Sequence, residues 1–197
     1  MGNTASYVKQ VRAELDALRR TLESFPDGET AKLVRMAGVI AKAIRSGRVV
    51  FTCGNGGSAA DAQHIAGELV GRFRRKVRGY KASALTTNSS VVTALANDFS
   101  FEEVFSKQIE SRGEKGDVLL ALSTSGGSPN VLRAVEEAKR LGLHTLAFSG
   151  KGGGELAAAA DLAVVVPHDD FARIQEVHMA LGHILCGLVE DMVVPRT

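Results

Sequence analysis

Apolar side chains recur every three or four residues in the first 46 positions and gather into short runs after that. The period of the first part is typical of helices with one apolar face. The turn Phe25–Gly28 separates two such segments, and Gly47 ends the second, as glycine commonly does after a last helical turn. We therefore expect amphipathic helices over residues 5–24 and 29–46.

Short apolar runs alternate with helical patterns over the rest of the chain. The runs predict strands at 48–53, 82–86, 117–122, 144–148 and 161–166. Helices are expected at 59–73, 89–95, 101–111, 129–141 and 171–190. This alternation indicates an α/β three-layer sandwich with a parallel sheet flanked by helices. We expect one domain over residues 1–197, in which 1–46 form an N-terminal helical extension that packs on the sheet and in the oligomer.

The composition is that of an ordinary folded protein. Its 197 residues are 45% hydrophobic, which is enough for one packed core. The formal net charge of +2 gives no reason to expect nucleic-acid binding. The basic run Arg72–Arg78 is interpreted as a solvated helix end and loop, and an anionic ligand nearby is the functional alternative.

Nothing in the pattern indicates export or a membrane. The N-terminus lacks the apolar core of a signal peptide, and no apolar run reaches the length of a membrane span. Cys53 and Cys186 lie far apart in apolar surroundings, which favours buried free thiols over a disulfide. We expect a soluble cytoplasmic protein.

Two loops rich in glycine and serine follow predicted strands, where ligands of parallel sheets bind. The first, Gly54–Ser58, lets the backbone approach a ligand closely, but a tight turn without a ligand explains it too. It lacks the full spacing of a dinucleotide-binding motif. The second, Ser123–Pro129, places hydroxyl groups before a helix N-terminus, which favours a phosphate monoester. Ser128 is also well placed as the N-cap of that helix.

Four polar residues on two predicted helices suggest a metal site. His64 and Glu68 are four residues apart and share one helix face, and Gln175 and His183 fall roughly on one face of the last helix. Zn²⁺ accepts such nitrogen and oxygen ligands. A hydrogen-bonded surface pair and satisfied core histidines, including His178, are the ordinary alternatives. Sequence spacing does not show whether the two helices meet.

Four segments together resemble the family of phosphoheptose isomerases, which carry a SIS domain. They are GNGGSAADAQHIAGEL, ALANDF, GDVLLALSTSGGSPNV and RIQEVHMALGHILCGLVE, and the resemblance runs from about residue 32 to 189. The serine loop alone marks only the wider SIS superfamily, whereas the combination of His64, Glu68, Gln175 and His183 is much more specific. Departures after the GNGG segment and at Gly127 and Pro129 remove no assigned group.

The resemblance implies a SIS fold, a homotetramer and a set of site residues. The implied phosphate site is Ser123, Thr124, Ser125 and Ser128, and the implied sugar contacts are Asn55, Gly56, Gly57, Asn97, Asp98 and Gln175. The implied ligands of one Zn²⁺ ion are His64, Glu68, Gln175 and His183. Acid–base chemistry is implied for Glu68 and His183.

The implied activity is an aldose–ketose isomerisation of sedoheptulose 7-phosphate to D-glycero-D-manno-heptose 7-phosphate, an early step toward the heptose of bacterial lipopolysaccharide. Some family members keep the fold without the chemistry and bind a bacterial replication initiator. That branch lacks the glutamate at position 68 and the histidine at position 183, and this chain has both. The isomerase is therefore favoured and the scaffold is the alternative. A sugar-phosphate-binding regulatory domain is a third hypothesis, although such domains are usually fused to others.

Overall fold

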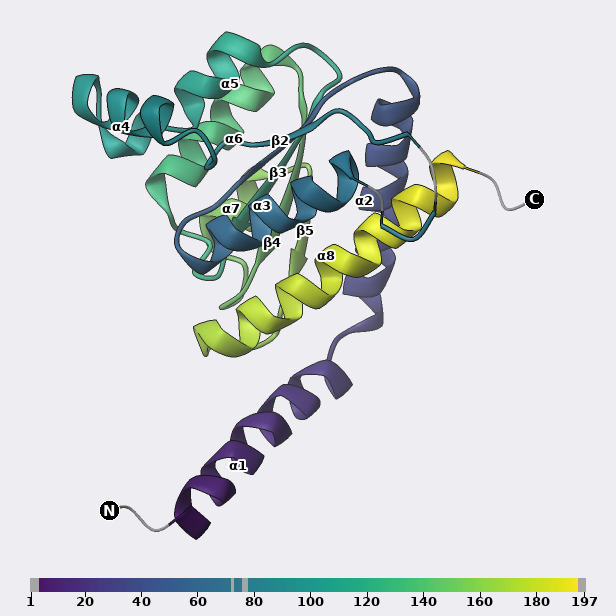
Figure 1. The fold of residues 1–197 in the computed structure, drawn as a ribbon, viewed down its shortest axis with the longest axis vertical. Helices are drawn as coiled ribbons and strands as arrows, with labels where there is room; N and C mark the ends of the chain where they lie inside the picture. Colours follow the sequence, from purple (N-terminus) through teal and green to yellow (C-terminus); the bar gives the residue numbers. More distant parts are fainter. Residues whose placement is uncertain (1–3, 72, 76–77, 195–197) are drawn as a thin grey trace.

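A five-stranded parallel sheet forms the centre of the computed structural model, which describes residues 4–71, 73–75 and 78–194 (Figure 1). The strand order is β2-β1-β3-β4-β5. The strands are β1 (Val50–Cys53), β2 (Ala82–Ala84), β3 (Val118–Ser123), β4 (His144–Ser149) and β5 (Leu162–Val165). All four pairings are parallel, as the alternation of short apolar runs and helices predicted.

Helices cover both faces of the sheet, which confirms the predicted three layers. They are α1 (Thr4–Glu23), α2 (Asp27–Arg45), α3 (Gly57–Val70), α4 (Ser89–Asp98), α5 (Ser106–Arg112), α6 (Pro129–Leu141), α7 (Gly154–Ala159) and α8 (Phe171–Val193), with a 3₁₀ turn η1 (Phe101–Glu103). Residues of α2, α3 and α8 pack on one face with Leu120, and residues of α5, α6 and α7 pack on the other with Leu119. Neighbouring strand residues point to opposite faces, so both are fully buried.

Helix α1 extends away from the sheet domain and meets it near the start of α8 (Figure 1). The guanidinium of Arg173 donates to the backbone oxygen and the carboxylate of Glu14. Most of the apolar side chains of α1 are nevertheless exposed, among them Tyr7, Val8, Val11, Leu15 and Leu22. The predicted apolar face of this helix is therefore present but is left uncovered by its own chain.

Several element boundaries differ from the sequence prediction by a few residues, and the main differences concern three helices. The expected helix 101–111 is divided into η1 and α5, and at the break the Ser106 hydroxyl donates to the backbone oxygen and the carboxylate of Glu103. Helix α3 ends at Val70 instead of continuing to residue 73, since the backbone of Gly71 leaves the helical region. The short helix α7 was not predicted at all.

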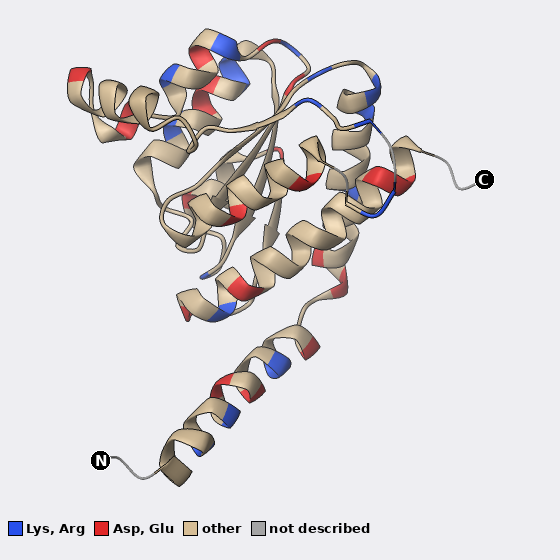
Figure 2. Ribbon diagram, viewed as in Figure 1, with Lys and Arg blue, Asp and Glu red and all other residues tan. Residues whose placement is uncertain are grey.

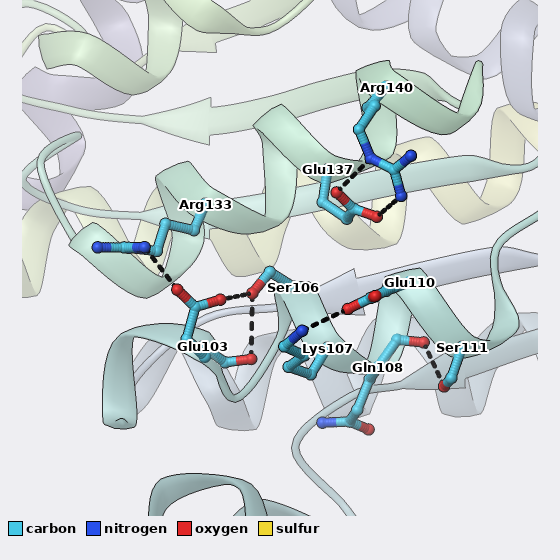
Figure 3. Close-up of polar contacts among 9 residues, drawn as sticks. All are labelled: Glu103, Ser106, Lys107, Gln108, Glu110, Ser111, Arg133, Glu137 and Arg140. Atoms are coloured by element: carbon cyan, nitrogen blue, oxygen red, sulfur yellow. Dashed lines mark hydrogen bonds and ion pairs between the residues drawn. The ribbon is translucent and has the colours of Figure 1, made fainter. Parts of the chain in front are cut away.

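Charged side chains fasten η1 to α6 (Figure 3). Arg133, one turn into α6, binds the carboxylates of Glu102 and Glu103. Within α6, Arg140 makes two hydrogen bonds to Glu137. Because α6 directly follows the serine loop, these contacts help to fix the helix whose N-terminus faces that loop.

The basic run around Arg75 lies against the acidic end of α8 (Figure 2). The Arg75 guanidinium pairs with Asp191, and the Glu190 carboxylate accepts backbone N–H groups of Arg74 and Arg75. Two residues of the run, Arg74 and Arg75, therefore have partners inside the chain. Residues 72, 76 and 77 of this run lie outside the described residues.

Candidate active site

The two predicted loops meet at the carboxyl edge of the sheet, because β1 and β3 are neighbouring strands. The side-chain amides of Asn55 and Asn130 exchange two hydrogen bonds, of 2.8 and 2.9 Å, between the glycine loop and the start of α6. Asn130 is buried, so this amide pair is a fixed cross-link between the loops. Sequence reasoning missed Asn130, which has no motif of its own.

Three serine hydroxyls converge in the loop after β3. Ser123 Oγ lies 3.1 Å from Ser128 Oγ and 3.4 Å from Ser125 Oγ. Gly126 N–H donates to Ser123 Oγ, and Gly127 N–H donates to Ser125 Oγ. Hydroxyl groups gathered in front of a helix N-terminus form an anion-binding geometry.

Ser128 occupies the N-cap position of α6 as predicted, with Pro129 as the first helical residue. Its side chain makes no capping bond to that helix, however, because the hydroxyl turns toward Ser123 instead. The expectation of a side-chain cap is therefore wrong in this detail. A hydroxyl that faces the loop is available to a ligand of that loop, and half-buried Thr124 lies in the same turn.

Three of the four predicted metal ligands come together between α3 and α8. His64 Nε2 and His183 Nε2 lie 2.8 Å apart, and Glu68 Oε1 lies 3.3 Å from His64 Nε2. One donor atom from each of the three residues lies within 4.8 Å of the others. The two helices thus meet, which spacing could not show.

The ring of Phe73 stacks on the ring of His183, with centroids 5.7 Å apart and planes inclined by 18°. The Arg74 guanidinium covers the Phe73 ring at 4.9 Å. The backbone N–H groups of Arg74 and Arg75 donate to the carboxylate of Glu190, a buried residue of α8. Phe73 therefore limits the orientations of His183. No sequence signal identifies it, because it lies beyond the end of α3.

Gln175 lies apart from this cluster, beside Gly57 at the start of α3. Eight residues of helix separate it from His183, which is a rise of about 12 Å. Its Nε2 donates to Asp61 Oδ1 at 3.4 Å. A Cβ atom on Gly57 would lie 2.2 Å from Gln175 Oε1, so a side chain at this position would require the amide to move.

Asp61 is a buried carboxylate at the edge of a cavity of about 500 Å³ that Gln175, Glu176 and Met179 also line. Burial raises the pKa of Asp61 above its ordinary value, and the hydrogen bond from Gln175 partly offsets this. Sequence reasoning missed this residue. The available signal is its position on the apolar stripe of α3, four residues before Ile65.

Asn97 and Asp98 occupy the exposed end of α4, where Asn97 Nδ2 donates to Asp98 Oδ1 at 2.9 Å. Helix α4 has no buried residue. A smaller cavity of about 170 Å³ lies between the glycine loop and the segment that follows α4, and Asn55, Val92 and Phe101 are among its lining residues.

His178 is a core histidine, as one alternative from the sequence held, but it is only partly satisfied, because its buried Nδ1 has no hydrogen-bond partner among the described residues. It is fully buried, and its Nε2 lies 3.1 Å from the backbone oxygen of Ser149. Burial lowers its pKa to about 4, so it is neutral at neutral pH. The two cysteines are buried free thiols, as predicted, and burial raises the pKa of Cys53 and of Cys186 to about 12.

Comparisons with known proteins identify the family of the chain. Residues 15–150 match the family model described as "SIS domain". The chain is 50% identical to the phosphoheptose isomerase of Aquifex aeolicus over 84% of this chain and 87% of the relative, and 45% identical to that of Thermodesulfovibrio yellowstonii over 93% and 92%. The chain belongs to the phosphoheptose isomerase family.

Solved structures of family members have the same fold. A phosphoheptose isomerase from Neisseria gonorrhoeae superposes with a TM-score of 0.89 at 38% identity, covering 94% of this chain and 99% of that chain. One from Francisella tularensis gives 0.86 at 31% identity, covering 97% and 100%. The SIS fold expected from the resemblance is thereby confirmed. Among the described residues of this phosphoheptose isomerase family member, no helix is both long and apolar enough to cross a membrane.

Proposed function

We propose that the protein isomerises sedoheptulose 7-phosphate to D-glycero-D-manno-heptose 7-phosphate, an early reaction in making heptose for bacterial lipopolysaccharide. The observation that carries this proposal is the pairing of a serine loop at the sheet edge with the His64–Glu68–His183 cluster, in a chain of this family. The first feature suits the phosphate of the substrate, and the second suits proton transfer next to a carbonyl.

The serine loop is proposed to bind the substrate phosphate through Ser123, Thr124, Ser125 and Ser128. Supporting this, the hydroxyls of Ser125 and Ser128 each lie within 3.4 Å of the Ser123 hydroxyl, and α6 begins directly behind them. The phosphate and the reacting carbons are at opposite ends of a seven-carbon sugar. Binding energy at the phosphate therefore positions C1 and C2 without taking part in the chemistry.

Glu68 and His183 are proposed to move the protons. The reaction removes a proton from C1 and returns one to C2 through an enediol, while O1 loses a proton and O2 gains one. The weak acidity of the carbon next to the carbonyl is the barrier, so a positioned base is required. Glu68 is the proposed base at carbon, and His183, oriented by Phe73, is the proposed partner at the oxygens.

A zinc ion is the proposed cofactor, held by His64, Glu68 and His183. Two imidazole nitrogens and one carboxylate oxygen within 4.8 Å form a donor set that zinc accepts, and three protein ligands leave a position open for substrate. When bound, such an ion supplies Lewis-acid polarisation of the substrate oxygens. A carboxylate that holds a metal is a weaker base, so metal binding and proton abstraction would compete at Glu68.

The remaining sugar contacts are proposed to come from the glycine loop at Asn55, Gly56 and Gly57, from Asn97 and Asp98, and from Gln175. The position of Gln175 next to Gly57 and Asp61, about 12 Å along α8 from His183, favours a role in binding the sugar over a role as a fourth ligand. We propose further that the protein works in the cytoplasm as a homotetramer, in which subunits cover the exposed apolar face of α1.

Turnover of sedoheptulose 7-phosphate by the purified, zinc-supplied protein tests the function. Appearance of the aldose, followed by NMR, is the expected result. The replication-initiator scaffold is the alternative from the sequence, and the phosphoheptose isomerases similar to this chain give it no support. Complete absence of turnover would contradict the proposed isomerase.

A further inference from the structure

The turn from Gly150 to Gly154, between β4 and α7, has an unusual backbone. Four consecutive residues from Lys151 to Gly154 have positive φ angles, of 49°, 75°, 98° and 58°. Residues that carry a side chain rarely adopt such backbone angles. Four in succession therefore point to contacts with other parts of the fold. The motif search in the sequence did not identify this turn, and none of its residues has a role in the site proposed above.

Two residues of this turn, Gly153 and Gly154, are in direct contact with the backbone of the serine loop. A Cβ atom on Gly154 would lie 2.7 Å from the oxygen of Gly126 and 2.9 Å from that of Ser125. A Cβ atom on Gly126 would lie 2.2 Å from the oxygen of Gly153. The N–H of Leu156 also donates to the Gly126 oxygen at 2.8 Å. The two loops are thus packed with no side chain between them.

Ser149 holds this turn in place through hydrogen bonds. It is the last residue of β4, pairs in register with Ser123 at the end of β3, and is fully buried. Its hydroxyl donates to the Gly153 oxygen at 2.9 Å. Its own backbone oxygen accepts from Val166 N–H and is contacted by His178 Nε2, so the residue is held on three sides. This hydroxyl is bonded to the turn and is not among those proposed to bind the phosphate.

We propose that Ser149 and Gly154 are positioning residues for phosphate binding, because they hold the serine loop in the shape that presents its hydroxyls. This proposal rests on the proposed function of that loop. Displacement of the Gly126 backbone by a few tenths of an ångström changes the spacing of Ser123 and Ser125, whose hydroxyls are bound by the N–H groups of Gly126 and Gly127. The three-hydroxyl arrangement is therefore set by a turn that the phosphate never contacts.

The experiment compares Gly154→Ala and Ser149→Ala with Gly152→Ala in the full-length protein. Gly152 is a matched control, because it lies in the same turn at a φ of 75° but has open space around its Cβ position. Binding of inorganic phosphate is measured by calorimetry, together with KM and kcat for sedoheptulose 7-phosphate and the zinc content. We expect Gly154→Ala to weaken phosphate binding and raise KM about ten- to a hundredfold relative to the control, the usual effect of losing a hydrogen bond to a charged group.

Ser149→Ala adds no atom and keeps the fold testable if Gly154→Ala does not fold. It is expected to weaken phosphate binding in the same direction, with kcat reduced less than KM is raised and with unchanged zinc content. Equal phosphate affinity in Ser149→Ala and the control would overturn the proposal. So would a parallel loss of phosphate binding, kcat and zinc, since that is general damage. Because phosphate binding is read without turnover, an inactive wild type would overturn the proposed function while this comparison still decides the positioning role.

Discussion

His64 and His183 bring their Nε2 atoms to 2.8 Å from each other although 119 residues separate them in the chain. The rings meet edge to face, with centroids 4.9 Å apart. At this distance one nitrogen donates a proton to the other, or both turn their lone pairs toward a shared cation. Glu68 Oε1 lies 3.3 Å from His64 Nε2, so its carboxylate can balance a positive charge in either arrangement. The zinc ion proposed above would use all three side chains at once.

Replacing His64 with alanine is expected to lower the zinc content of the purified protein. It removes one of three donor atoms that lie within 4.8 Å, and two remaining ligands bind the ion more weakly. The metal-to-subunit ratio, measured by plasma mass spectrometry after dialysis, checks this. Gln63→Ala is a matched control, because Gln63 is the exposed neighbour on α3 and bonds to Thr86 instead. Full zinc occupancy in His64→Ala would exclude the assigned metal centre.

Glu68→Gln is expected to lower kcat at least about a hundredfold while the protein stays folded, because a general base commonly contributes this much or more. The amide has the size of the carboxylate but cannot accept the proton from C1. Zinc content is measured on the same sample, so that loss of the base is separated from loss of the metal. Glu110→Gln, at an exposed ion pair on α5, is the control and should keep wild-type kcat. A wild-type rate in Glu68→Gln would refute the role of base.

Local spacing in the sequence predicted part of this site. The rest depends on tertiary packing, which spacing does not reveal. The helical period placed His64 and Glu68 on one face, and the structure has them in contact. The meeting of α3 with α8 is a long-range contact, which no spacing within one helix reveals. Phe73 and Asp61 were missed for the same reason, since each acquires its partner only in the folded chain.

The same distinction between local preferences and long-range contacts applies to the helices and strands of the fold. Helix α6 has the predicted bounds, because Pro129 starts it and Gly142, with a φ of 78°, ends it through local backbone preferences. The split between η1 and α5 depends on Ser106 and Glu103 instead, and Arg133 from another helix also binds that glutamate. Such contacts override helix propensity and are absent from a periodicity argument.

Changing Ser123 and Ser125 together to alanine is expected to raise KM for the sugar phosphate more than it lowers kcat. Each lost hydrogen bond to a charged phosphate costs about 1.5–3 kcal/mol, which is a factor of ten or more in affinity. Steady-state kinetics on the folded double variant check this. Ser111→Ala, at a hydroxyl that bonds only its own helix backbone in the described contacts, serves as control. Unchanged KM would mean that the loop has a structural role alone.

The exposed apolar side chains of α1 are expected to be covered in a homotetramer. Val11 and Leu15 are 59% and 63% exposed, which is unfavourable for a helix that extends from the sheet domain unless another subunit packs on it (Figure 1). Val11→Glu with Leu15→Glu should lower the mass measured by light scattering, whereas Lys9→Glu, which changes charge without removing an apolar group, should not. A monomeric wild type at micromolar concentration would contradict the predicted assembly.

The last prediction concerns the loss of stability in acid, which we assign in part to His178. Burial lowers its pKa from 6.5 to about 4. Between these two pH values His178 binds a proton in the unfolded chain but not in the folded chain. The free energy of unfolding therefore falls as the pH drops through this window. The loss from this residue alone is about 2–3 kcal/mol by pH 4.5, since one pKa unit corresponds to about 1.4 kcal/mol. Above pH 6.5 the residue is neutral in both states and contributes no slope.

His178→Gln separates this effect from all other titrations. Glutamine can keep an N–H donor near the backbone oxygen of Ser149, which His178 contacts at 3.1 Å, but it does not titrate. At pH 7 the variant should be less stable than wild type, because it packs less well against Phe148, whose ring centroid lies 5.7 Å from that of the histidine.

Unfolding by urea at pH 7 and at pH 4.5, at one protein concentration, gives the difference in the free energy of unfolding between the two proteins. That difference should shrink by about 2–3 kcal/mol at the lower pH, because only wild type has a buried imidazole to protonate. A difference that stays constant across the two pH values would show that His178 makes no contribution to acid sensitivity.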